Sequence, residues 1–330
     1  MKLIFFYCLL ICSSFVFVAA QSPAPQRTPV SQRTPSPAEE TRRTIRQQED
    51  ANRRFEALKN VGRTGRNNNP NRTTALQTIS NIYRKPNKEE SKLLAPDKED
   101  VKKYAQFLRQ ANTGITKLIT DKGCAEYTNI LNVSDDCLKY SMPGAGSSFS
   151  FRTENYRIRR LSDLTYIGNS FQSLGILAHA ILVNIGDTPI EQVSLQTNGV
   201  NFLTDFKIST EFEKAKEVDH QLIDGINNNG FFYSRNVDAA QTSTFVLRSI
   251  AYRGNYYRAV QGLVYDELDF DERRDVTVVF RIVRRDEESV TILWKQLANQ
   301  KVPVLKRSNR DPQKIEENKF MAETEKKADN

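Results

Sequence analysis

Apolar positions along the chain recur with two periods, first helical and then alternating. Between 101 and 119 they follow helical spacing, and Asp97 can serve as an N-cap, so we expect an amphipathic helix here. Gly114 weakens this helix locally, and Gly123 is suited to end it. Its apolar stripe needs a surface to cover, and we expect that surface to be the strand-rich segment that follows.

From Ser147 onward the period shifts toward two, which is typical of strands with one buried face. The expected strands lie at 147–151, 156–158, 176–185 and 200–208, and the nearly continuous apolar run at 176–185 predicts a central strand. Helical spacing returns over 211–226.

The last third predicts two hairpins. Residues 242–252 and 256–265 flank a short turn at 253–255, and residues 276–283 and 290–294 flank a charged tip. Trp294 is expected to be a core or cross-strand residue. The fold class is therefore α+β, a mainly antiparallel sheet with an N-terminal amphipathic helix packed on it, forming a single globular domain over 96–305. The charged tail 306–330 is expected to be disordered or a frayed helix.

The first twenty residues predict a secretory signal peptide. An apolar run over 3–18 follows Lys2, and Val18 and Ala20 place small side chains where a signal peptidase admits them. The run is too short to span a bilayer stably, so no transmembrane span is expected in the mature chain from Gln21. We therefore expect an extracytoplasmic location, periplasmic or secreted.

Positive charge is concentrated near the N-terminus. The chain carries a net charge of +8; residues 21–90 hold fourteen Lys and Arg against seven Asp and Glu, whereas residues 91–330 are balanced. We call residues 21–95 the basic arm. It is rich in Pro, Arg and Asn, so we expect it to be largely disordered, with a solvated or partner-dependent helix at 38–60.

A basic arm on an exported protein favours attraction to anionic envelope polymers or lipid headgroups through residues 21–90. A solvated tether is the alternative. Nucleic acid is disfavoured as a partner, because the arm lacks aromatic residues interleaved with its arginines.

Cys8 and Cys12 lie in the signal, so the mature chain keeps only Cys124 and Cys137. Two cysteines in an oxidising compartment predict one disulfide, with a pair of free buried thiols as the alternative. Asn71 and Asn132 begin acceptor patterns for glycosylation, which would matter only in a eukaryotic secretory pathway.

Known catalytic motifs are missing from the sequence. His179 lies in an apolar run and is interpreted as a core or sheet-face residue, whereas His220 sits in a charged helix and is expected to face solvent. No His-Glu-x-x-His, paired Cys-x-x-Cys or Gly-x-Ser-x-Gly motif occurs, and the small-residue segment 144–148 lacks the lysine of a phosphate loop. We therefore predict no catalytic residue, metal or cofactor from motifs.

An acidic cluster remains between two strands. It comprises Asp266, Glu267, Asp269, Asp271, Glu272 and Asp275. A calcium loop is disfavoured because Arg273 and Arg274 occupy positions where an EF-hand needs an oxygen ligand and a glycine, so we interpret the cluster as a solvated turn. Of the adjacent Tyr256 and Tyr257, one is a candidate for exposure.

The sequence favours an exported, non-catalytic binding or envelope-associated protein of unknown ligand. The alternative is a secreted hydrolase acting on glycans or peptides through carboxylates that the fold brings together, with Asp266, Asp269 and Asp271 as the nearest candidates.

Overall fold

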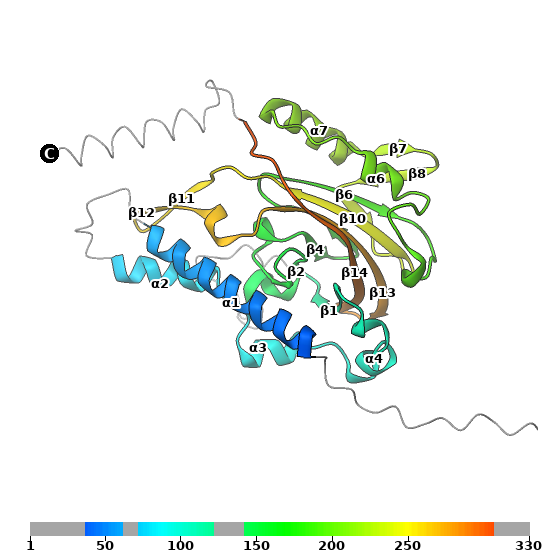
Figure 1. Cartoon of the computed structure of the whole chain (residues 1–330), viewed down its shortest axis with the longest axis horizontal. Coiled ribbons are helices and arrows are strands. Elements are labelled where there is room, and N and C mark those ends of the chain that lie inside the picture. The colour runs from blue at the N-terminus through cyan, green and yellow to red at the C-terminus, as the bar shows by residue number, and fades with distance from the viewer. Residues whose placement is uncertain (1–36, 62–71, 122–141, 307–330) are drawn as a thin grey trace, which may run out of the picture.

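A curved antiparallel sheet of seven strands forms the centre of the molecule in a computed structural model, which describes residues 37–61, 72–121 and 142–306 (Figure 1). Its strand order is β1 (Thr113–Ile119), β14 (Ser289–Lys301), β13 (Arg274–Arg285), β10 (Thr244–Ala251), β6 (Ala178–Asn184), β8 (Phe231–Ser234) and β7 (Ile226–Asn228). Every neighbouring pair in this sheet is antiparallel.

Two smaller antiparallel sheets accompany the large one. The first has five strands in the order β3 (Asn155–Tyr156), β2 (Ser148–Ser150), β4 (Leu164–Ile167), β5 (Ser170–Gln172) and β9 (Asn236–Asp238). The second pairs β11 (Tyr257–Val260) with β12 (Leu263–Asp266). The α+β class with mainly antiparallel sheets agrees with the expectation from the sequence.

The helices of the described residues are short apart from α1. They are α1 (Pro37–Asn60), α2 (Arg72–Ile82), α3 (Lys88–Leu93), α4 (Lys98–Lys103), α6 (Asn201–Asp205) and α7 (Phe212–Asp224). Single 3₁₀ turns occur at η1 (Phe107–Arg109), η3 (Pro143–Gly146), η4 (Arg159–Leu161), η5 (Ile190–Gln192) and η6 (Glu267–Phe270).

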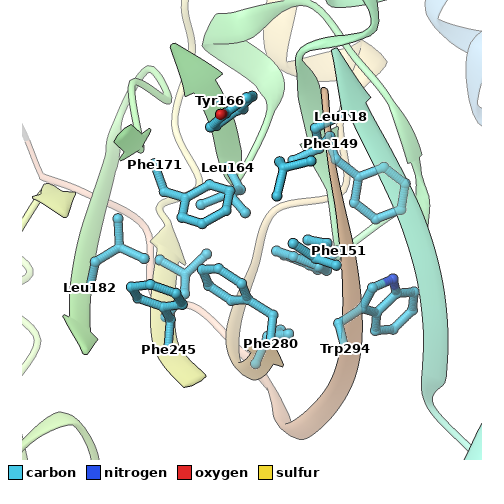
Figure 2. Packing of buried hydrophobic residues seen from close by; sticks show 14 of the residues in the cluster. Leu118, Phe149, Phe151, Leu164, Tyr166, Phe171, Leu182, Phe245, Phe280 and Trp294 are labelled. Atoms are coloured by element: carbon cyan, nitrogen blue, oxygen red, sulfur yellow. The ribbon is translucent and has the colours of Figure 1, made fainter. Parts of the chain in front are cut away.

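The central strands are buried on both faces, which explains their nearly continuous apolar sequence. In β10, Phe245 and Leu247 point into one core, whereas Val246 between them points into the other. The first core lies between the large sheet and the five-stranded sheet and is rich in aromatic side chains (Figure 2). Trp294 belongs to it, with only 4% of its surface exposed, as predicted. The second core lies under α6 and α7.

Residues 97–120 do not form the single helix that we expected. Asp97 does cap α4, accepting a hydrogen bond from the Glu99 amide at 2.8 Å, but the helix ends at Lys103 and the chain becomes strand β1 at Thr113. β1 pairs with β14, and Gly114 lies directly opposite Trp294. A glycine is required there because a Cβ would lie 2.3 Å from the indole ring. The helical spacing of the apolar residues was therefore misleading.

Over its described part, the basic arm packs against the domain that we expected to begin at residue 96. α1 and α2 pack on η4, β12 and η6 to form a third core. Its buried members include Ala57, Val61, Ala75, Ile79, Tyr83, Leu161, Tyr265 and Phe270. Figure 1 shows α1 lying along one side of the molecule with α2 beside it. The sparse apolar stripe of α1 suffices because buried charged residues complete the contact.

Two strand predictions also need correction. Residues 256–265 do not pair with 242–252; they form their own hairpin, β11–β12, which turns at Gln261 and Gly262, both of positive φ. Residues 201–205 form helix α6 in place of a strand, with Val200 and Leu203 buried three residues apart. The predicted central strand, the helix over 211–226 and the final hairpin are confirmed as β6, α7 and β13–β14.

Candidate functional site

The acidic cluster 266–275 is not a solvated turn, which corrects our interpretation of it. Glu267, Asp271 and Asp275 are exposed by only 0%, 5% and 3%. Each is paired with buried or half-buried arginine, and Asp275 receives two hydrogen bonds from Arg248 at 3.0 and 2.7 Å. The cluster therefore directs three of its six carboxylates into the protein, where arginines from distant parts of the chain neutralise them.

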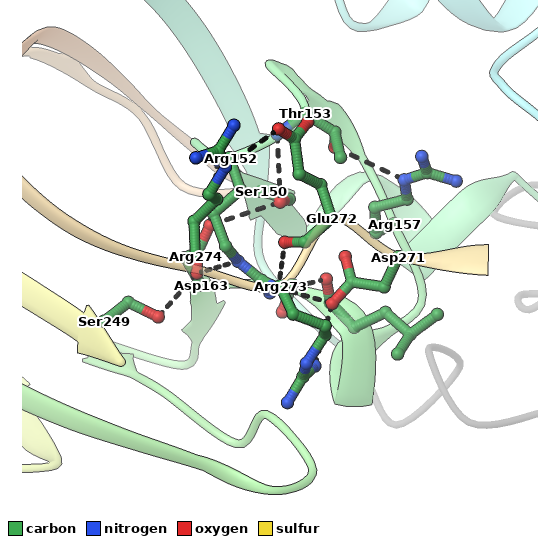
Figure 3. Close-up of polar contacts among 12 residues, drawn as sticks. Ser150, Arg152, Thr153, Arg157, Asp163, Ser249, Asp271, Glu272, Arg273 and Arg274 are labelled. Atoms are coloured by element: carbon green, nitrogen blue, oxygen red, sulfur yellow. Dashed lines mark hydrogen bonds and ion pairs between the residues drawn. The ribbon is translucent and has the colours of Figure 1, made fainter. Parts of the chain in front are cut away.

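Four residues with buried side chains form what we call the central ion-pair network: Arg152, Asp163, Asp271 and Arg273. Arg152 lies between the two carboxylates, with its Nε 2.8 Å from Asp163 and its Nη1 paired with Asp271 (Figure 3). Arg273 contacts the same Asp271 oxygen at 2.8 Å. Ser249 of β10 also donates to Asp163 at 2.6 Å. The network joins the β2–β4 region to the start of β13.

The electrostatics of this network favour the ionised form of Asp271. Burial alone would raise the pKa of Asp271, but the charges of Arg152 and Arg273 outweigh burial and hold that pKa below its ordinary value. The side chains of Arg152, Asp163 and Asp271 are exposed by 1%, 0% and 0%. Asp271 is therefore an ionised structural group, and it is closed to a substrate.

Helix α1 reaches the same region through Asp50, which is 6% exposed. Its carboxylate accepts a hydrogen bond from Arg157 Nη2 at 2.8 Å and lies 2.8 Å from Lys85 Nζ. Arg53 of α1 contacts Glu272 at 3.2 Å. Charged side chains thus fasten α1 to the segments around 157 and 272, while Figure 3 shows Arg157 on the side of the cluster away from Arg152.

A second buried group connects the end of α2 to η6. Tyr83 donates to Glu267 at 2.6 Å and lies 2.9 Å from the Tyr265 hydroxyl. Arg160 Nε contacts both oxygens of Glu267 at 2.7 and 2.8 Å. Burial and the Glu267 charge raise the pKa of Tyr83 well above its ordinary value, so Tyr83 remains a neutral hydrogen-bond donor.

Asp266 and Asp269 are the remaining pair of the cluster. Asp266 accepts hydrogen bonds from the Tyr256 and Leu268 amides, both at 3.0 Å, and so caps η6. The pKa of Asp269 is raised to about 6, first by partial desolvation and then by the Asp266 charge, although its side chain is exposed at the surface.

Of the two histidines, one is buried and the other is exposed. His179 on β6 is buried, and its Nδ1 lies 3.3 Å from the Tyr252 hydroxyl. Burial lowers the pKa of His179, so the ring is held neutral. His220 is exposed on α7. Tyr257 is 37% exposed and Tyr256 is half-buried.

Several predicted features lie outside the described residues: Cys124, Cys137, Asn71 and Asn132. The disulfide therefore stays a prediction. Within residues 37–61, 72–121 and 142–306, no three His, Cys, Asp or Glu side chains gather so as to hold a metal ion. None of the helices in these same ranges is long and apolar enough to cross a membrane.

Sequence reasoning missed the arginines that matter most, Arg152, Arg157, Arg160 and Arg248. One local signal was available, because 157–160 reads Arg-Ile-Arg-Arg between strands, which is an unusual density of cations for a half-buried segment. Their acidic partners lie 11 to 119 residues away, so pairing could not be read from spacing.

Comparison of the chain with protein-family models, with curated proteins and with solved structures gives no significant match.

Proposed function

We propose that this is an exported, non-catalytic binding protein that associates with anionic polymers or lipid headgroups of the cell envelope. The observation that carries the proposal is the charge partition, with a net charge of +7 in residues 21–90 and a balanced remainder. Anionic surfaces attract such a segment by about 1 kcal/mol per Lys or Arg at the surface.

The positive charge of the basic arm is divided between residues that form ion pairs within the protein and residues that precede them in sequence. Part of it is used within the protein, since Arg53 pairs with Glu272, Arg84 with Glu90 and Lys59 with Glu56. Arg27 and Arg33 precede these residues in sequence, and no acid occurs between Gln21 and Glu39. We therefore assign the long-range attraction to the first part of the arm.

A second candidate function is supported by one observation. Asp269 lies close enough to Asp266 for the Asp266 charge to contribute to the raised pKa of Asp269, and glycan hydrolysis uses a pair of neighbouring carboxylates. Asp266 accepts hydrogen bonds from two backbone amides, which favours a capping role for this carboxylate over a catalytic one. If the protein is a hydrolase, Asp269→Asn should abolish hydrolysis of envelope glycans or peptides; equal rates in variant and wild type would remove this pair from consideration.

Cosedimentation of the chain 21–330 with isolated envelope fractions tests the leading proposal. We expect binding at low salt that falls as ionic strength rises, and a roughly tenfold or greater loss of affinity in the double variant Arg27→Gln, Arg33→Gln. The matched control is Lys207→Gln, Lys301→Gln, which removes two exposed positive charges from the domain. Equal affinity in all three proteins, or binding insensitive to salt, would contradict the proposal.

A further inference from the structure

Four cationic side chains surround the single carboxylate of Asp50. Arg157 Nη2 and Lys85 Nζ each lie 2.8 Å from it, Arg54 lies at 3.6 Å and Arg53 at 3.8 Å. They come from three separate segments: α1, the residues that follow α2, and the residues that follow β3. We call these four cations the Asp50 cation cluster.

The acids around this cluster do not balance its charge. Among the described residues, the ion pairs of the four cations are made with Asp50 and with Glu272, and Glu272 is shared with Arg274. Five cations thus face two carboxylates, an excess of three positive charges. Burial lowers the pKa of Arg157; the charges of Asp50 and Asp271 oppose this effect, and those of Arg54 and Arg53 add to it.

One cation of the cluster is buried, and the other three, which we call its rim, can be reached by solvent. The Arg157 side chain is only 2% exposed, whereas those of Arg53, Arg54 and Lys85 are exposed by 28%, 22% and 30%. Arg53 Nη1 is itself buried and has no hydrogen-bond partner among the described residues. An unsatisfied buried donor of a charged group is costly, which shows that the internal acids do not use all the hydrogen-bonding capacity of this cluster. An incoming anion would contact the exposed parts of Arg53, Arg54 and Lys85.

We propose that the Asp50 cation cluster binds a phosphate group. Guanidinium groups match the oxygens of a tetrahedral oxyanion through paired charge-assisted hydrogen bonds, and a dianion would offset most of the positive excess. This inference rests on the proposed function, because it names the chemical group that the protein recognises on an anionic surface. The cluster would bind this group in the same way whether it is free inorganic phosphate or the phosphate of a lipid headgroup.

The test is calorimetric titration of the chain 21–330 with inorganic phosphate, and with chloride at matched ionic strength. We expect saturable binding of phosphate alone, and about a tenfold or greater weakening in Arg53→Gln, because one charge-assisted hydrogen-bonding group is lost. Arg258→Gln is the matched control: Arg258 is 34% exposed and lies 3.8 Å from Glu267, and its loss should change affinity by less than about twofold. Circular dichroism and urea unfolding establish that both variants remain folded.

Equal responses to phosphate and chloride, or equal weakening in both variants, would overturn the inference. Binding to vesicles of phosphatidylglycerol in phosphatidylcholine distinguishes the phosphate of a lipid headgroup from free inorganic phosphate. Saturable phosphate binding that Arg53→Gln weakens, without vesicle binding, supports a free-phosphate site and contradicts the envelope proposal. Vesicle binding that requires Arg27 and Arg33 but is unchanged in Arg53→Gln keeps the envelope proposal and overturns this site.

Discussion

Loss of one carboxylate from the central ion-pair network should destabilise the protein severely. In Asp271→Asn, the buried guanidinium groups of Arg152 and Arg273 lose a shared counter-charge while remaining enclosed. Removal of one partner from a buried pair costs about 3–5 kcal/mol, a large share of the roughly 5–15 kcal/mol that stabilises a typical domain. With a urea m-value of about 3 kcal/mol/M, the unfolding midpoint should fall by about 1–2 M.

The control is Asp187→Asn, the same substitution in another carboxylate paired with arginine. Asp187 pairs with Arg281, but its side chain is 74% exposed, so water can replace the lost partner. We expect this variant to lose less than about 1 kcal/mol. Urea unfolding followed by fluorescence of Trp294 gives both values. If Asp271→Asn and Asp187→Asn lose similar amounts, burial does not set the strength of this network and the reasoning is refuted.

Three further predictions concern the fold. Gly114→Ala should lose about 1–3 kcal/mol in urea unfolding, because its methyl group overlaps the indole of Trp294; a neutral substitution would mean that the ring moves aside freely. Tyr83→Phe should cost about 1–3 kcal/mol by removing a donor from buried Glu267, and unchanged stability would contradict the docking of α2. His179 should titrate below about pH 6.5 by NMR. Because the pKa of His179 is lower in the folded than in the unfolded chain, its contribution to stability is complete above about pH 6.5 and is lost as the pH falls and the unfolded chain takes up a proton. A titration midpoint of His179 above pH 6.5 would contradict its burial.

The sequence predicted elements well where one period governed a long segment. β6 and the β13–β14 hairpin are apolar and rich in β-branched residues, and α7 shows one clear helical stripe, so local sequence and tertiary packing agree. The prediction of one helix over 97–120 was wrong because the apolar positions of this segment fit both a helical and a strand period. Only the partner strand β14 decides between them, and strand pairing is not a local property.

The candidate site was less predictable than the fold. The acids of residues 266–275 were visible in the sequence, but their burial depends on Arg152 and Arg160, which are more than a hundred residues distant. Without those partners a run of acids is typical of a solvated turn. The packing of α1 was missed for the same reason, since Asp50, a residue that usually faces solvent, faces the protein and pairs there with Arg157.

The measurement that tests the central claim most directly is fractionation of the cells that make this protein, followed by salt extraction of the envelope and mass determination of the released chain. The account predicts a protein that begins at Gln21, is recovered with the envelope and is released as salt screens its positive charge. A chain that still begins at Met1, or one that never associates with the envelope at low salt, would contradict the account.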